Sequence, residues 1–321
     1  MPGCFARIVG MSEFTEITSG LRFPEGPIAM PDGTVIVMEM LGPRITRVHP
    51  DGSKETVSDI VGGPNGAAIG PDGALYLCNN GGCFTPLALG DLLFPGPIDR
   101  ERYVGGRIQR VDLTTGVVTD LYTHCDGRAL LAPNDLVFDA HGGFWFTDHG
   151  IRDREARTSD LTGIYYATAD GLHISEQVFP TEGPNGIGLS PDGATLYWAE
   201  TYSGRVFRRA ICAPGVLAPE IPLDPTTCLA GLPGMQMLDS LAVDGDGNVC
   251  VATLLNGGVT VVSPVDGGTS HIATGDLMTT NICFGDNDGS GEYRDAYITC
   301  SSSGRLLHMR WPRPGLRLNY L

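Results

Sequence analysis

The stretch GPNGIGLSPDGATLYWAE, residues 183–200, is one of six versions of a pattern that recurs along this chain. Each version opens with a polar residue in a turn, continues with a short apolar run, turns through Asp and Gly, and ends in a second β-rich run. The other versions are FPEGPIAMPDGTVIVME (23–39), GPNGAAIGPDGALYLCN (63–79), APNDLVFDAHGGFWFTD (132–148), LDSLAVDGDGNVCVAT (238–253), and TTNICFG followed by AYITCS (279–301). A pattern that returns every ~40 to 70 residues is typical of a repeat architecture.

Each version predicts two antiparallel strands joined by a tight turn. The apolar runs are short, and PDG or DGDGN supplies the Gly and Asp that a chain reversal needs. Segments between the versions, such as residues 106–113, 163–168 and 204–210, supply outer strands, so that each unit becomes a four-stranded blade. We therefore predict an all-β fold, a six-bladed β-propeller formed by residues 1–321 as a single domain, with residues 14–18 closing the ring against the last blade. A linear solenoid is the alternative, although solenoid repeats are generally shorter.

Composition limits the classes of partner. The chain has 321 residues, 42% of them hydrophobic, and a formal net charge of −16. This charge argues against nucleic acid and against anionic membrane surfaces, since both attract basic protein surfaces. No apolar stretch reaches the length of a membrane span and residues 1–14 lack a signal-peptide core, so we expect a cytoplasmic protein. The nine cysteines are expected to be mostly reduced thiols.

The polar residue that opens each version should occupy the same ring around the channel axis, so the six side chains are expected to converge at one mouth. They are Glu25, Asn65, Asn134, Asn185, Asp239 and Asn281. Oxygen donors of this kind suit one hard divalent cation, and two carboxylates would balance its charge. We expect Ca²⁺, with Mg²⁺, Mn²⁺ and Zn²⁺ as alternatives. Turn formation is the competing interpretation for Asn and Asp, but it does not account for Glu25 in the same register.

An insertion at residues 83–106 is the main irregularity of the repeat. It is rich in apolar residues, among them Phe84, Leu87 and Phe94, and loops of this length in compact proteins are commonly functional. We interpret it as a lid or wall near the channel mouth that shapes an apolar substrate pocket. A short helix packed on a blade edge and a subunit contact are the alternatives, and the sequence leaves the oligomeric state open.

Two residues at the end of the third version have different expected roles. His149 follows an inner strand in FTDHG and is a candidate substrate contact, with turn or surface packing as the alternative. Asp148 is predicted to be structural, because its equivalents in other versions are Glu39, Asn79 and Glu200.

The repeats FPEGP, APNDLVFD with FTD, GPNGIGLSPDGATLYWAET and LDSLAVDGDGNVCVAT resemble those of the senescence marker protein, gluconolactonase and regucalcin family. The ending TCSSSGRLLHMRWPRPGLRLNYL resembles the close of bacterial sugar-lactonase relatives, so the likeness covers almost the whole chain. The resemblance implies a six-bladed propeller that binds one divalent metal and hydrolyses lactones. It implies metal ligation by Glu25, Asn185 and Asp239, and a contact of Asn134 with substrate or metal.

One departure from the family pattern concerns the substrate. Some members place an Arg two residues before the Asn of the third version, where it holds a sugar lactone. This chain has Ala132 at that place, while Arg128 lies further upstream and is kept as a candidate substrate contact. Together with the apolar insertion, the change makes a more apolar lactone a competitor to a sugar lactone.

The expected chemistry is metal-dependent opening of a small-molecule lactone. The cation would polarise the carbonyl and activate water, and Asp239 would act as general base or orient the water. Asn134 and Asn65 would donate hydrogen bonds to substrate oxygens, including the developing oxyanion. The alternatives are a metal-binding propeller without catalysis, an aryl esterase resembling paraoxonases, and an enzyme resembling strictosidine synthase, whose chemistry would need no metal.

Overall fold

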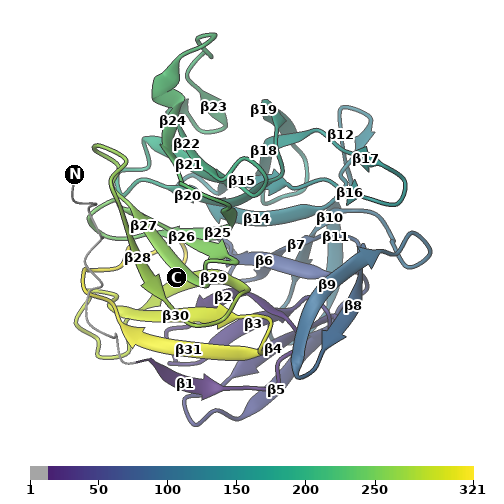
Figure 1. Cartoon of the computed structure of the whole chain (residues 1–321), viewed down its shortest axis with the longest axis vertical. Helices are drawn as coiled ribbons and strands as arrows, with labels where there is room; N and C mark the ends of the chain where they lie inside the picture. Colours follow the sequence, from purple (N-terminus) through teal and green to yellow (C-terminus); the bar gives the residue numbers. More distant parts are fainter. Residues whose placement is uncertain (1–13) are drawn as a thin grey trace.

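Residues 14–321 are described by a computed structural model, and they form six antiparallel sheets arranged around a central channel (Figure 1). Apart from one short 3₁₀ turn, η1 (Pro225–Thr227), the regular structure is all strand. The predicted all-β, six-bladed propeller is confirmed. Within residues 14–321, no helix is long and apolar enough to cross a membrane. Most of the stretch in which we expected no signal peptide, residues 1–13, lies outside the described residues.

The first three blades follow the chain in order, each with its innermost strand first. Blade one contains β2 (Pro24–Ala29), β3 (Val35–Glu39), β4 (Arg44–Val48) and β5 (Lys54–Asp59). Blade two contains β6 (Pro64–Ile69), β7 (Leu75–Asn79), β10 (Arg107–Val111) and β11 (Val118–Tyr122). Blade three contains β14 (Pro133–Phe138), β15 (Gly143–Asp148), β18 (Thr162–Thr168) and β19 (Ile174–Thr181).

The last three blades repeat this order with one addition and one exchange. Blade four contains β20 (Pro184–Leu189), β21 (Thr195–Glu200), β22 (Arg205–Ala213) and β24 (Cys228–Gly231), with β23 (Val216–Leu217) also paired to β22. Blade five contains β25 (Met237–Val243), β26 (Val249–Leu254), β27 (Gly258–Val262) and β28 (Thr269–Ala273). Blade six contains β29 (Thr279–Gly285), β30 (Asp295–Cys300), β31 (Arg305–Arg310) and β1 (Thr15–Thr18).

The two ends of the chain close the ring together. Strand β1 pairs antiparallel with β31, with Glu16 opposite Leu307, so the sixth blade takes its outer strand from the N-terminal region, as predicted for residues 14–18. The N-terminal strand thus completes the fourth strand of the closing blade and ties the two ends of the described chain together.

A glycine after the opening polar residue lets the innermost strands approach one another closely. A Cβ on Gly26 would lie 2.5 Å from the backbone oxygen of Asn65, and one on Gly186 would lie 2.4 Å from the backbone nitrogen of Leu241. Real Cβ atoms essentially never come so close to another heavy atom, so packing around the axis requires glycine at residues 26 and 186.

Three hairpins project from the blades. The insertion at 83–106 forms β8 (Phe84–Leu89) and β9 (Leu92–Ile98), a two-stranded arm rather than a helix (Figure 1). Two smaller hairpins pair β12 (His124–Cys125) with β13 (Arg128–Ala129), and β16 (Arg152–Asp153) with β17 (Thr158–Ser159). The eight cysteines in the described part of the chain are free thiols, in agreement with the sequence.

Candidate active site

A pocket of about 630 Å³ occupies one mouth of the channel. Its floor comes from the opening polar residue of five versions of the repeat, each near the start of the innermost strand of its blade. These residues are Glu25, Asn65, Asn134, Asn185 and Asp239. The structure therefore brings together five of the six side chains that the sequence aligned, including every residue predicted to bind metal.

In blade six the ring position is Thr280, so the prediction that Asn281 belongs to the ring is wrong by one residue. Thr279 pairs with Cys300 as Pro24 pairs with Glu39, which places the next residue, Thr280, in the register of Glu25. Thr280 Oγ1 donates to the carbonyl of Pro24 at 3.2 Å. Asn281 instead accepts a hydrogen bond from the N–H of Ile282 at 2.8 Å and lines a cavity at the other end of the channel.

Three oxygen atoms of the floor are buried and have no hydrogen-bond partner within the described structure. They are Glu25 Oε2, Asn65 Oδ1 and Asn134 Oδ1. All three accept hydrogen bonds and cannot donate, apart from a protonated Glu25, and leaving such a group buried and unpaired costs about 1 to 3 kcal/mol. Oxygen atoms that need a positive partner are the donor set that a hard cation takes.

The other two floor residues are held in place by their neighbours. Asn185 Nδ2 donates to Thr201 Oγ1 at 3.2 Å, and Asn185 Oδ1 accepts from Ser240 Oγ at 3.5 Å. Asp239 Oδ1 accepts from the N–H of Ser240 at 3.1 Å, and the Asn185 side chain also hydrogen bonds to Asp239. These contacts fix both side chains before any ligand arrives.

Three buried carboxyl groups lie near one another: Glu25 and Asp239 of the floor, and Asp135, which lines the cavity at the other end of the channel. Burial raises the pKa of Glu25 well above its usual range, and the charges of Asp239 and Asp135 raise it further. Burial likewise raises the pKa of Asp239 to about 7, with a smaller contribution from Asp135, while a hydrogen bond from Asn185 opposes the shift. A divalent cation would remove this repulsion and favour the ionised carboxylates.

The oxygen atoms available to a metal ion at the floor belong to two kinds of side chain, carboxylates and amides. Within residues 14–321, no group of three or more His, Cys, Asp or Glu side chains is arranged to hold a metal ion. An ion at the floor would therefore depend on amide oxygens as well as on Glu25 and Asp239. Such a set suits Ca²⁺ or Mg²⁺ better than it suits zinc.

In blades two and three, the last residue of the second strand supports the loop that leads into the floor. Asp148 accepts hydrogen bonds from the N–H groups of Leu131 and Ala132, both at 2.7 Å. Asn79 accepts from the N–H of Gly63 at 2.9 Å in the same way. These bonds agree with the structural role predicted for Asp148.

The arm β8–β9 supplies an apolar wall of the pocket. Its lining residues include Phe84, Leu87, Phe94 and Ile98. The N–H of Leu93 donates to the carbonyl of Ser302 at 2.8 Å, so the arm, which leaves blade two, is also attached to the loop that follows β30 in blade six. The insertion thus stands over the mouth as a wall fixed at two places.

His149 lines the pocket, as the sequence suggested. Its ring packs edge-on against Tyr202, with centroids 5.2 Å apart. Burial lowers the pKa of His149, and the nearby charge of Arg152 lowers it further, so the ring is neutral at neutral pH.

Arg128 does not reach the pocket, which corrects its assignment as a substrate contact. It lies on β13, its side chain is 64% exposed, and its guanidinium pairs with Glu176 at 3.2 Å. Arg128 is near Asn134 in the sequence but not in space, because it lies on the short hairpin β12–β13, which turns its side chain away from the channel.

Sequence reasoning missed a second set of pocket residues. Each directly follows the last residue of a version of the repeat, as His149 does, so together they form one column of equivalent positions: Met40, Asn80, Thr201 and Leu254. Tyr202 and Arg152 were also missed. Extending the repeat alignment by one residue would have found the column, whereas nothing in the repeat indicates Tyr202 or Arg152.

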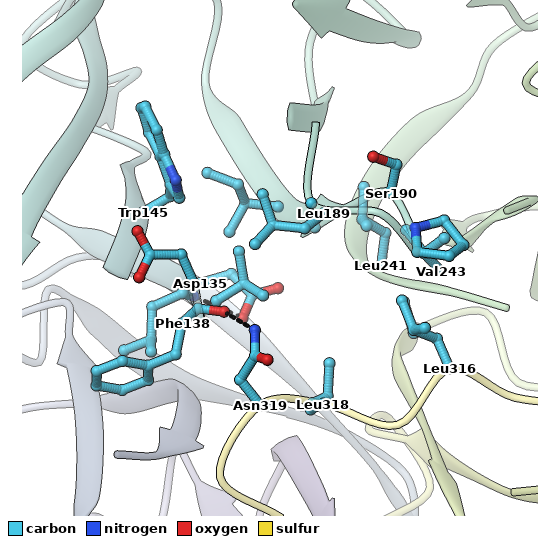
Figure 2. Close-up of a pocket in the computed structure, with 18 of the residues that line it drawn as sticks. Asp135, Phe138, Trp145, Leu189, Ser190, Leu241, Val243, Leu316, Leu318 and Asn319 are labelled. Atoms are coloured by element: carbon cyan, nitrogen blue, oxygen red, sulfur yellow. Dashed lines mark hydrogen bonds between the residues drawn. The ribbon is translucent and has the colours of Figure 1, made fainter. Parts of the chain in front are cut away.

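A second cavity, of about 460 Å³, lies at the other end of the channel (Figure 2). Apolar side chains such as Leu189, Leu241 and Val243 surround it, and the C-terminal segment closes over it with Leu316, Leu318 and Asn319 (Figure 2). Asn319 Nδ2 donates to the carbonyl of Phe138 at 2.9 Å.

Comparison with known proteins identifies a set of relatives. The family model described as "SMP-30/Gluconolactonase/LRE-like region" matches residues 23–302. Lactonase drp35 of Staphylococcus aureus (strain MRSA252) is 30% identical over 225 residues, which cover 68% of this chain and 60% of that protein. Lactonase drp35 of Staphylococcus epidermidis is 28% identical over 227 residues, covering 69% of this chain and 60% of that protein. The matched region thus spans less than two thirds of the length of these relatives.

Solved structures share the architecture. A gluconolactonase of Xanthomonas campestris superposes with a TM-score of 0.73 at 23% identity, over 95% of this chain and 91% of that chain. Regucalcin of Agrobacterium tumefaciens, described as a calcium-binding protein, superposes with a TM-score of 0.69 at 18% identity, over 93% of this chain and 95% of that chain. At these identities the similarity establishes the fold.

Proposed function

This chain belongs to the SMP-30/gluconolactonase/LRE-like family, and from that premise we propose that it is a lactonase whose reaction takes place on the floor of the larger pocket. The observation that carries the proposal is the set of buried oxygens of Glu25, Asn65 and Asn134 that lack any partner in the described structure. They lie beside the carboxyl group of Asp239 at the base of a cavity large enough for a small cyclic ester.

The floor fits one divalent cation. Glu25, Asn185 and Asp239 would hold it, and Ca²⁺ is the ion we propose, because every available donor is oxygen and the set combines carboxylates with amides. Mg²⁺, Mn²⁺ and Zn²⁺ are the alternatives to be tested. When bound, such an ion polarises an ester carbonyl and makes water more acidic.

The side chains of the chain itself bind and orient the reactants. Asp239 accepts a proton from water as the water oxygen bonds to the carbonyl carbon of the lactone. The ring carbon–oxygen bond then breaks, the leaving alkoxide takes the proton that Asp239 accepted from water, and the product is a hydroxy acid. The amides of Asn134 and Asn65 donate hydrogen bonds to substrate oxygens, including the carbonyl oxygen as it gains negative charge.

The walls favour an apolar lactone over a sugar lactone. The arm β8–β9 presents Phe84, Leu87 and Phe94 to the pocket, and Ala132 offers no charged group to hydroxyls. A sugar ring placed against these side chains would lose hydrogen bonds to water without replacing them.

The test is an assay of ester hydrolysis in which the protons released by the reaction are measured. Chelator-stripped protein is assayed on sugar lactones, alkyl lactones and aryl esters, with Ca²⁺, Mg²⁺, Mn²⁺ or Zn²⁺ restored singly. We expect activity to return with one or more ions in the wild type and not in Glu25→Gln, and the same ion to raise the melting temperature of the wild type only. Turnover that survives chelation would contradict a metal-dependent mechanism and favour chemistry like that of strictosidine synthase. Tight ion binding without any turnover would contradict the proposed lactonase activity and favour a metal-binding propeller without catalysis.

A further inference from the structure

The rim of the larger pocket carries an arginine that is stacked on an aromatic ring. Arg152 begins β16, and its guanidinium carbon lies 3.6 Å from the centre of the Tyr202 ring. The imidazole of His149 packs against the same ring, and all three side chains line the pocket. A cation held over an aromatic face is fixed in position without being neutralised.

The charge of Arg152 is free to receive a ligand. Its hydrogen bond to Ser159 Oγ is long, at 3.4 Å, and no carboxylate in the described part of the chain comes within 4.0 Å of it. Its neighbour in sequence shows the contrast, because Asp153 is buried and pairs with Arg100 at 2.9 Å. Glu155 also lines the rim, exposed to solvent, and forms no ion pair with Arg152.

The pocket therefore has three chemical layers. The floor presents carboxylate and amide oxygens, the wall presents the apolar side chains of β8–β9, and the rim presents two guanidinium groups, those of Arg152 and Arg154, of which only Arg152 is stacked on Tyr202. A lactone ring that reaches the floor directs a long substituent along the wall towards the rim. Guanidinium groups bind carboxylates through two parallel hydrogen bonds, which makes them selective for this group.

Building on lactone hydrolysis as proposed above, we propose that Arg152, positioned by Tyr202, selects cyclic esters that carry an anionic group at the far end of an apolar substituent. A carboxylate is the group to test first. Arg152 contacts the anionic group, and Tyr202 is a positioning residue.

The experiment uses pairs of alkyl lactones of equal chain length, one ending in a methyl group and the other in a carboxylate. We expect the wild type to have a kcat/KM about tenfold higher for the carboxylate member at some chain length, as one charge-assisted contact provides. Arg152→Gln should remove this preference by raising KM for the carboxylate member, with kcat and the methyl member little changed. Tyr202→Phe should retain the preference, and Tyr202→Leu should weaken it through KM.

Arg102→Gln is the matched control. It removes one positive charge from an exposed residue of the insertion that does not line the pocket, so it should leave the preference intact. An equal loss of preference in this variant would show that only net charge matters and would overturn the assignment.

Failure of this inference can be separated from failure of the proposed function. Equal hydrolysis of both members at every chain length would overturn the role of Arg152 while lactone hydrolysis stood. If no lactone is hydrolysed, the proposed function fails, and calorimetry on the same pairs then decides the matter. Tighter binding of the carboxylate member to wild type than to Arg152→Gln would uphold the role of Arg152, and equal binding would overturn it.

Discussion

The same innermost strands line both ends of the channel, and two neighbouring residues of one strand can line opposite ends. The two ends nevertheless differ in chemistry. Asn134 lines the larger pocket and has a buried oxygen without a partner, whereas Asp135, the next residue, lines the smaller cavity. Asp135 receives hydrogen bonds from the N–H of Leu136 at 2.9 Å and from the side chain of Ser240. The comparison teaches that unsatisfied acceptors, rather than burial or charge alone, distinguish the end that needs a ligand.

Closure of the two ends also differs. The larger pocket is bordered by an arm that leaves a wide apolar space, whereas the smaller cavity is covered by the C-terminal segment through Leu316, Leu318 and Asn319 (Figure 2). If chemistry is confined to one end, substitutions there should lower activity without lowering stability, and substitutions at the other end should do the reverse.

The largest effect is expected from Asp239→Asn. The change keeps the shape of the side chain but removes both a proton acceptor and a charge that balances the cation, so kcat should fall by at least about 10²-fold. Lactone hydrolysis measured by proton release, with circular dichroism to verify folding, gives the answer. Activity within a few-fold of the wild type would exclude Asp239 from the reaction.

Asn134→Ala is expected to rank next. Loss of one donor to a developing oxyanion typically costs about 10² to 10³ in rate. Because Asn134 Oδ1 has no protein partner, the folded protein should lose little stability. The effect should appear in kcat rather than in KM. A rise in KM alone would show that Asn134 binds the ground state and the transition state equally.

Phe94→Ala should change selectivity rather than catalysis. The substitution removes apolar wall area from the arm, so kcat/KM for long alkyl lactones should fall by about tenfold, while small lactones are affected less. Val117→Ala, an exposed apolar change on blade two outside the pocket, is the control. Equal losses for long and short substrates would remove the arm from substrate selection.

Asn319→Ala is expected to have the smallest effect on activity. It deletes the hydrogen bond to the carbonyl of Phe138 at the far end of the channel, so the free energy of unfolding should decrease by about 1 kcal/mol while kcat stays unchanged. Urea denaturation tests the expected loss of stability, and the lactone assay tests whether kcat is unchanged. A marked loss of kcat with stability preserved would contradict the functional separation of the two ends.

The repeat was sufficient to predict the fold and most of the floor. Each version combines a turn signal with two short apolar runs, and the radial arrangement brings equivalent residues to one ring. Prediction failed where this signal fades. Blade six has TTNICFG in place of P-N-G, and without the proline and glycine as markers the alignment chose Asn281 instead of Thr280.

Other features of the site depend on contacts that a linear pattern does not encode. Arg128 was assigned by its distance along the chain, but a two-residue strand turns it towards Glu176. The stacking of Arg152 on Tyr202 joins an irregular hairpin of blade three to a loop of blade four. Neither segment has the periodicity that makes a strand predictable.

The pairing of β1 with β31 has a consequence for how the protein folds. Thr280 belongs to the last blade and contacts Glu25 in the first, while the outer strand of that last blade, β1, precedes blade one in the sequence. The contacts that close the ring therefore join segments that are very far apart along the chain, and such contacts form slowly because closing so long a loop costs chain entropy. Thr280 meets Glu25 only when the first and last blades come together, so closure of the ring and completion of the floor belong to the same folding step.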